Sequence, residues 1–118
     1  MNGQRTNFRM EDEFITLPQG DTLSFGFEVF DKNDEPISLD EAEFSIKDKV
    51  AEGNLILRKT LGNGITEVDI GQYVVRVAPE ETEDIFLGEY YYDLRVLKDS
   101  DKATLLRGVL HIVWSTEN

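Results

Sequence analysis

The feature that most constrains the fold is a long alternating segment near the carboxyl end, from Gly88 to Trp114. In its first half Tyr90, Tyr92, Leu94 and Val96 alternate with polar residues, a period of two that places the apolar side chains on one face of a strand. After a short polar stretch the alternation resumes with Leu106, Gly108, Leu110, Ile112 and Trp114. Two such runs joined by a polar turn predict a long antiparallel hairpin and, with it, an all-β domain.

The composition is that of one folded domain. The chain has 118 residues, of which 40% are hydrophobic, enough for a single core. It has no cysteine, which excludes disulfides and thiolate metal sites. It has no apolar run near the roughly 20 residues that span a membrane, and the first ten residues lack the apolar stretch of a signal peptide. We therefore expect synthesis inside the cell.

The charge is strongly negative. The formal net charge is −12, with 24 acidic residues against 12 basic ones. Such a surface repels polyanions and anionic membranes, so we expect neither a nucleic-acid nor a membrane partner. Excess acid also keeps a β protein soluble and protects the edges of its sheets.

The chain divides into a short arm and one domain. We predict a flexible amino-terminal arm over residues 1–12, which are polar and mixed in charge, and a single β-sandwich domain over 13–118. Pro79 and the acidic residues after it favour one helical turn. Turn signals every eight to twelve residues or so predict seven or eight strands in two packed sheets. The side chains expected in the core are Leu23, Phe25, Phe27, Val29, Phe44, Ile46, Tyr73, Val75, Val77, Tyr92, Leu94, Leu110 and Ile112.

Short motifs recur along the chain in a recognisable order. The first group is Gly20-Asp21-Thr22, Pro36-Ile37-Ser38-Leu39 and Ala42-x-Phe44-x-Ile46. The second group is Gly64-Ile65, Gly71-x-Tyr73, Pro79-Glu80-x-Thr82, Gly88-x-Tyr90-x-Tyr92-Asp93-Leu94 and Thr104-Leu105-Leu106-x-Gly108. In this order they resemble the immunoglobulin-like modules of tailed-bacteriophage structural proteins, and are similar to the amino-terminal domain of baseplate upper proteins. The likeness covers about Phe14 to Val113.

The resemblance implies an immunoglobulin-like antiparallel β-sandwich without catalytic activity or cofactor. It implies a phage or prophage tail component, made in the bacterial cytoplasm, whose partners are other tail or baseplate proteins or a second copy of itself. In such folds a Gly-x-Tyr-x-Cys run opens strand F, and Tyr92 stands where the cysteine would be. A tyrosine there can hydrogen-bond back to the preceding corner. The alternative is a carbohydrate-binding sandwich, which needs exposed aromatics; Tyr91 and Trp114 are the candidates.

Catalytic and metal-binding patterns are weak. We predict no catalytic residue, because the only histidine, His111, has no serine, cysteine or acid partner in a motif. One cation site is conceivable from Asp31 and Asn33 in one loop with Asp99 and Asp101 in another, since calcium takes six to eight oxygen ligands. The first loop lacks the glycine and the distal glutamate of an EF-hand, so a plain polar turn is the simpler interpretation.

The nominally solvent-facing side of the carboxyl-terminal hairpin is unusually apolar. It holds Tyr91, Leu97, Leu105, Val109 and Val113 among charged residues. A free solvent face carries fewer aliphatic side chains. Partial burial at the edge of the core and contact with another subunit both account for this pattern. We predict these five residues as the candidate interface.

Overall fold

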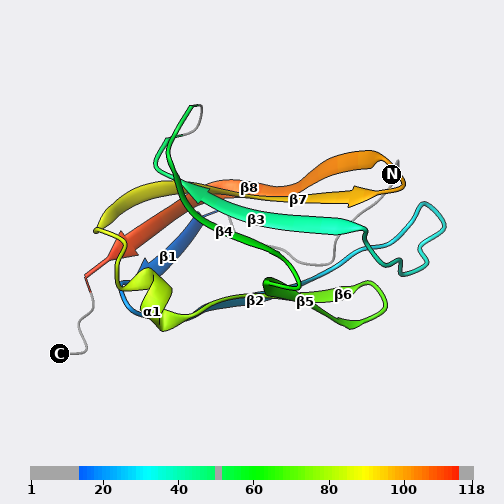
Figure 1. Ribbon diagram of the computed structural model, residues 1–118, viewed down its shortest axis with the longest axis horizontal. Coiled ribbons are helices and arrows are strands. Elements are labelled where there is room, and N and C mark those ends of the chain that lie inside the picture. The colour runs from blue at the N-terminus through cyan, green and yellow to red at the C-terminus, as the bar shows by residue number, and fades with distance from the viewer. Residues whose placement is uncertain (1–13, 50–51, 115–118) are drawn as a thin grey trace.

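The computed structural model describes residues 14–49 and 52–114, and the predicted arm at 1–12 lies outside them. The described residues form eight strands and one short helix, drawn in Figure 1. Their bounds are β1 (Phe14–Pro18), β2 (Leu23–Glu28), β3 (Glu41–Lys47), β4 (Leu55–Leu61), β5 (Gly64–Asp69), β6 (Gln72–Val77), α1 (Pro79–Thr82), β7 (Gly88–Lys98) and β8 (Asp101–Val113). The predicted helical turn is α1, with Pro79 at its start and Glu80 and Glu81 in its first turn.

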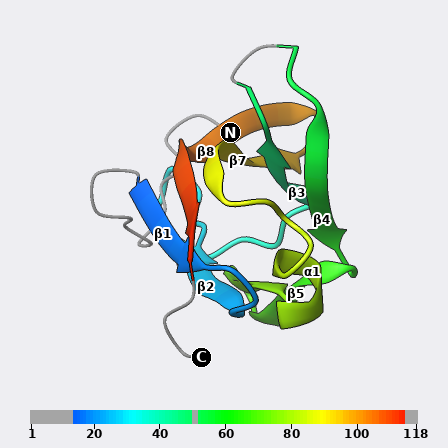
Figure 2. The same cartoon turned by 90° about the vertical axis from the view of Figure 1, so that its left-hand side faces the viewer.

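The strands are hydrogen-bonded in the order β1-β8-β7-β3-β4-β5-β6-β2. The link between β4 and β5 is only two residue pairs long. At this link the chain passes from one layer of strands to the other. Figures 1 and 2 show the result, with β1, β8, β7, β3 and β4 in one layer and β5, β6 and β2 in the other. Most neighbours are antiparallel, but β1–β8 and β4–β5 are parallel pairs.

The hairpin that dominates the sequence is the longest ladder of the fold. β7 and β8 pair from Gly88↔Ile112 to Lys98↔Asp101. Asp99 and Ser100 close it with φ of 51° and 74°, the positive values that a two-residue type I′ turn requires. The Asp99 amide donates to Asp40 Oδ2 at 2.8 Å, which ties this turn to the residue before β3.

The core lies between the two layers. Twelve of the thirteen predicted core side chains are buried, and Phe25 is partly buried yet packed against them. The Phe27 ring stacks on Tyr73 with centroids 5.2 Å apart, and Phe25 meets Phe44 edge-on at 5.4 Å. Ser24 and Gly26 are exposed, so the predicted register of β2 is confirmed. Among the described residues no helix is long and apolar enough to cross a membrane.

The strand order is that of an immunoglobulin-like sandwich, and the predicted fold class is confirmed. β3, β7 and β8 correspond to strands C, F and G, and β4 adds the C′ strand of the variable type. β5, β6 and β2 make the opposing sheet. The corner bond that was expected from Tyr92 is made instead by Tyr90, two residues earlier, whose hydroxyl donates to the Phe86 carbonyl at 2.7 Å. Tyr92, at the cysteine position, is buried against Phe44.

Candidate functional site

The outward-pointing side chains of the five-stranded layer form a surface that we call the outer sheet face. Because strand neighbours share a face, the register arranges them in rows across the sheet. Lys47, Tyr91 and Val109 form one row, and the next row holds Ser45, Asp93 and Arg107. A third row holds Glu43, Arg95 and Thr104. The inward residues between these rows belong to the core.

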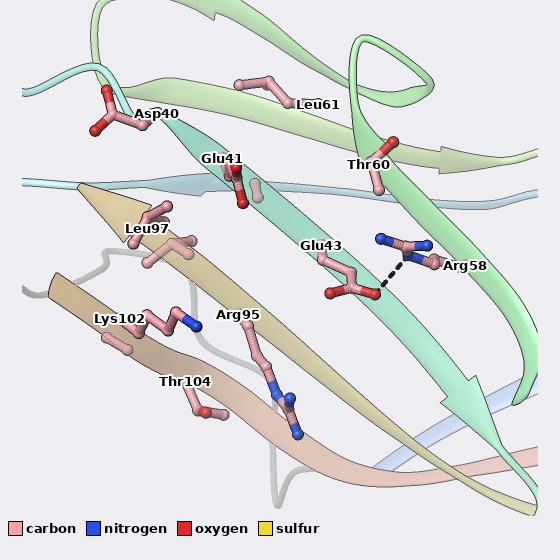
Figure 3. A pocket seen from close by; sticks show the side chains of 13 residues that line it. Asp40, Glu41, Glu43, Arg58, Thr60, Leu61, Arg95, Leu97, Lys102 and Thr104 are labelled. Carbon is pink, nitrogen blue, oxygen red and sulfur yellow. Dashed lines mark ion pairs between the residues drawn. The ribbon is translucent and has the colours of Figure 1, made fainter. Parts of the chain in front are cut away.

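Basic residues concentrate on this face. Two open grooves of about 650 Å³ and 400 Å³ lie on it, and Figure 3 shows the larger one between β4, β3, β7 and β8. Their walls carry six basic residues and four acidic ones. The rest of the chain has only six basic residues against twenty acidic ones. The basic residues are Lys47, Lys49, Arg58, Arg95, Lys102 and Arg107, and the acidic ones are Asp40, Glu41, Glu43 and Asp93.

Two of the acidic side chains already have basic partners on the face. Arg58 Nε lies 2.6 Å from Glu43 Oε2, as drawn in Figure 3, and an Arg95 guanidinium nitrogen lies 3.3 Å from Asp93 Oδ2. Arg107 makes no ion pair with any described residue. The groove walls therefore carry a small excess of positive charge on a molecule whose net charge is −12, and Glu89 beside Tyr91 adds a further acidic group to the same face.

An apolar part adjoins the charged rows. Phe14 of β1 is 45% exposed, pairs in register with Val109, and meets the His111 ring edge-on at 5.7 Å. Tyr91, on the other side of Val109, is half-buried. Its hydroxyl donates to Glu89 Oε1 at 3.2 Å, and this bond to a carboxylate, together with the negative charge, raises the pKa of Tyr91. The outer sheet face thus combines an aromatic end with an arginine-rich end.

The structure separates the five predicted interface residues. Tyr91 and Val109 lie side by side on the outer sheet face, and Leu97 and Val113 are half-buried toward opposite ends of the hairpin. Leu105 is the exception, because the ladder shifts register between the pairs Leu94↔Leu106 and Arg95↔Thr104. This bulge places an extra residue on β8, and Leu105 packs partly against the core instead of lining the face.

Among the residues of the conceivable cation site, the Asp31 side chain bonds the backbone of its own loop. Asp31 Oδ1 accepts the amides of Asn33 at 2.8 Å and Glu35 at 3.0 Å, the arrangement of a polar turn. Asp99 sits in the type I′ turn and Asp101 opens β8. Within residues 14–49 and 52–114, no group of three or more His, Cys, Asp or Glu side chains is placed to hold a metal ion.

Sequence reasoning named Trp114 as a candidate exposed aromatic but missed the surface that it forms with Phe86 and Leu87. Phe86 is 83% exposed, Leu87 46% and Trp114 69%. The three gather at one end of the molecule, because Gly88 pairs with Ile112 and the chain enters β7 beside the point where β8 ends; Figure 2 looks onto this end. We call them the apolar tip. The available signal was the Ile85-Phe86-Leu87 run, which directly follows an acidic stretch and lies outside every alternating segment.

Comparison with known proteins identifies the fold alone. No protein-family model and no curated protein sequence matches the chain. A marsupial T cell receptor structure aligns with TM-score 0.57 and 8% identity over 98% of this chain, which spans 54% of the receptor chain. A swine CD8αα homodimer aligns with TM-score 0.52 and 13% identity, over 95% of this chain and 99% of that one. MtrC from Shewanella baltica OS185 aligns with TM-score 0.50 and 12% identity, over 98% of this chain and 22% of MtrC.

Proposed function

We propose that this protein is a non-catalytic interaction module of a phage or prophage tail assembly, made in the bacterial cytoplasm and built into a baseplate-type structure. Its docking surface is the outer sheet face, and its partners are other tail proteins or further copies of itself. The observation that carries the proposal is the concentration of six basic residues beside Tyr91, Val109 and Phe14 on one face of an otherwise acidic domain.

Physical reasoning supports a protein partner for this face. Interfaces are enriched in arginine and aromatic residues and combine a desolvated centre with a polar rim. The outer sheet face offers Arg58, Arg95 and Arg107 beside Tyr91 and Val109. Folding alone does not require arginines to gather in a chain of net charge −12, because dispersed charges serve solubility equally well. The order of the sequence motifs supports the tail assignment.

The carbohydrate-binding alternative has less support. A sugar platform needs exposed aromatic rings close together. Tyr91 is half-buried, whereas Trp114 is 69% exposed. Trp114 lies five residues beyond Val109, the partner of Tyr91, which is roughly 17 Å along an extended chain. The two candidate rings therefore do not form one platform.

The test is whether the protein is built into particles through the outer sheet face. Tail-containing particles are purified by density gradient after induction of the encoding strain, and the chain is quantified by mass spectrometry. Wild-type protein is expected at a fixed ratio to the other tail proteins. A Val109→Lys variant is expected to be lost from the particles, because a lysine replaces an apolar contact in the apolar part of the face.

The matched control is Val68→Lys, since Val68 is 58% exposed on β5 in the opposite layer. This variant is expected to be incorporated like the wild type. Circular dichroism melts of both variants check that each remains folded. Absence of the wild-type chain from the particles, or equal incorporation of the two variants, contradicts the proposal.

A further inference from the structure

Hydrogen bonds fix the backbone that carries the apolar tip, and the tip projects into solvent. Three hydrogen bonds of 2.7 Å tie down its base: Tyr90 donates to the Phe86 carbonyl, Gln19 to the Ile85 carbonyl, and Thr82 to the Asp21 carbonyl. Phe86 nevertheless leaves 83% of its surface exposed. A large aromatic residue on an anchored loop loses little conformational freedom when a partner covers it. This is the property of a preorganised contact residue.

The residues before the tip are acidic. Glu80, Glu83 and Asp84 are all exposed and lie within the six residues before Phe86. The tip and its flank therefore present negative charge next to an aromatic group. The outer sheet face presents Arg107, which makes no ion pair with a described residue, and Arg95, which is paired with Asp93, next to its own apolar part. The two surfaces are therefore complementary in charge, and each has an apolar part that the other can cover.

We infer that the apolar tip of one copy docks on the outer sheet face of a second copy. Phe86 and Leu87 cover the apolar part around Tyr91 and Val109, while the acidic flank faces the arginines. This inference rests on the proposed function and names its partner as another copy of this chain. The occupant follows from charge complementarity, because the same chain supplies both the acidic flank and the basic face.

The contact joins two different surfaces, so it is heterologous. Each copy keeps a free tip at one end of the assembly and a free face at the other, and a heterologous contact closes into a ring or continues as a filament. This distinguishes it from a two-fold dimer in which the faces of two copies meet. In that dimer the six basic residues of one face would oppose those of the other.

Complementing variants test this arrangement. The tip variant carries Phe86→Ser and Leu87→Ser, and the face variant carries Arg95→Glu and Arg107→Glu. Sedimentation velocity is recorded up to about 1 mM, because weak association is detectable there. The wild type is expected to form assemblies larger than a dimer, and each variant alone to associate at least about tenfold more weakly. Mixed, the variants restore one intact interface, so a 1:1 heterodimer and nothing larger is expected.

The controls change equivalent residues elsewhere. Val68→Ser with Ile70→Ser removes two other exposed apolar side chains, 58% and 62% exposed. Lys32→Glu with Arg76→Glu reverses two exposed charges outside the face. Both controls are expected to assemble like the wild type, and melting curves confirm that all four variants fold.

A wild type that stays monomeric at every concentration overturns the inference, as does a mixture that forms no heterodimer. Particle incorporation through Val109, measured separately, would survive either result, so the failure of this contact is distinguishable from failure of the proposed function. Salt gives an additional readout. Near 0.1 M salt, interactions between exposed charges more than about 10 Å apart are largely screened. Attraction across the contact is therefore expected to outweigh the repulsion between the two net charges, and raising the salt further is expected to weaken assembly.

Discussion

The two faces of the five-stranded layer differ in what accounts for their residues. On the inner face Phe44, Leu94 and Leu110 are buried, and each is at most 1% exposed. On the outer face the corresponding rows hold charged and half-buried residues, including Arg107 and Tyr91. Folding requires the inner face to be apolar, because it meets the opposing sheet. It places no such demand on the outer face.

The comparison separates residues kept for stability from residues available for binding. Substitutions on the inner face are expected to cost folding free energy, whereas those on the outer face leave stability nearly unchanged and alter association. The charged residues provide the sharpest contrast. Lys59 lies on the inner side of β4, opposite Phe44, and its ammonium group is ion-paired with Glu81 of α1. Arg107 on the outer face has no such described partner.

The largest effect is expected for Leu94→Ala. Leu94 is 0% exposed at the centre of β7, where the two layers meet and a cavity cannot easily collapse. Loss of a fully buried leucine in such a site costs about 2–5 kcal/mol in the free energy of unfolding. Urea denaturation measures it. A loss below about 1 kcal/mol would show that the inner face is not the rigid core that the comparison assumes.

A smaller loss is expected for Tyr73→Phe, which removes a polar group from the inner side of β6. The Tyr73 hydroxyl accepts the buried Leu39 amide at 2.6 Å and donates to Glu67 Oε2 at 3.2 Å. Burial is the main cause that raises the pKa of Tyr73, with the Glu67 charge adding to it. Without the hydroxyl, the Leu39 amide stays buried and unsatisfied, which costs about 1–3 kcal/mol.

The measurement for Tyr73→Phe is again a urea melt, with Tyr91→Phe as the control. Tyr91 also bonds a carboxylate, but on the outer face and with its partner exposed. The stability of the Tyr91→Phe variant is expected to stay close to that of the wild type. If both variants lost the same free energy of unfolding, a polar group on the inner face would matter no more for stability than one on the outer face.

The inner face was predictable from the sequence for a simple physical reason. Its signal is local, since alternation with a period of two needs only neighbouring residues to be known. β2 and β7 show this directly, where Phe27, Tyr92 and Leu94 are buried as predicted. The short motif that resembles strand F indicated a corner bond, but it was assigned to Tyr92 and is made by Tyr90.

The outer sheet face was only partly predictable, because its composition depends on which strands become neighbours. Arg58 of β4 and Arg107 of β8 are 49 positions apart in the sequence and line one surface only through the order β8-β7-β3-β4. The bulge at Leu105 was hidden for a different reason. The alternation from Leu106 onward is unbroken, so nothing in the pattern shows that the ladder shifts one residue earlier.

A moderate, pH-dependent effect is expected for Glu81→Gln. The hydrogen bond from Lys59 is the main cause that lowers the pKa of Glu81 in the folded protein, and the Ala78 amide lowers it further. A lowered folded-state pKa contributes stability above the unfolded value of about 4.5, and this contribution disappears as the pH falls through the folded-state value. At pH 7 the variant is therefore expected to be less stable, by up to about 1 kcal/mol.

Urea melts at pH 7, 5, 4 and 3 follow that difference, which should shrink toward zero at the acid end. Glu80→Gln is the matched control, because Glu80 is the exposed neighbour in the same turn of α1. Its stability difference should be small at every pH. A Glu81→Gln difference that stays constant with pH would mean that the ion pair with Lys59 contributes nothing to the inner-face contact.

The smallest effect on stability is expected for Arg107→Ala on the outer sheet face. Arg107 is exposed and lies opposite Asp93, which already has Arg95 as its ion partner. Truncation therefore leaves no buried charge unpaired, and the change in unfolding free energy should remain within about 0.5 kcal/mol. The same variant should weaken association if the outer sheet face is the proposed docking surface, because one of its cations is gone. A stability loss above about 1.5 kcal/mol would place Arg107 among the groups that hold the fold together. In that case the arginines of this face would be explained by folding, and their presence would no longer argue for a partner.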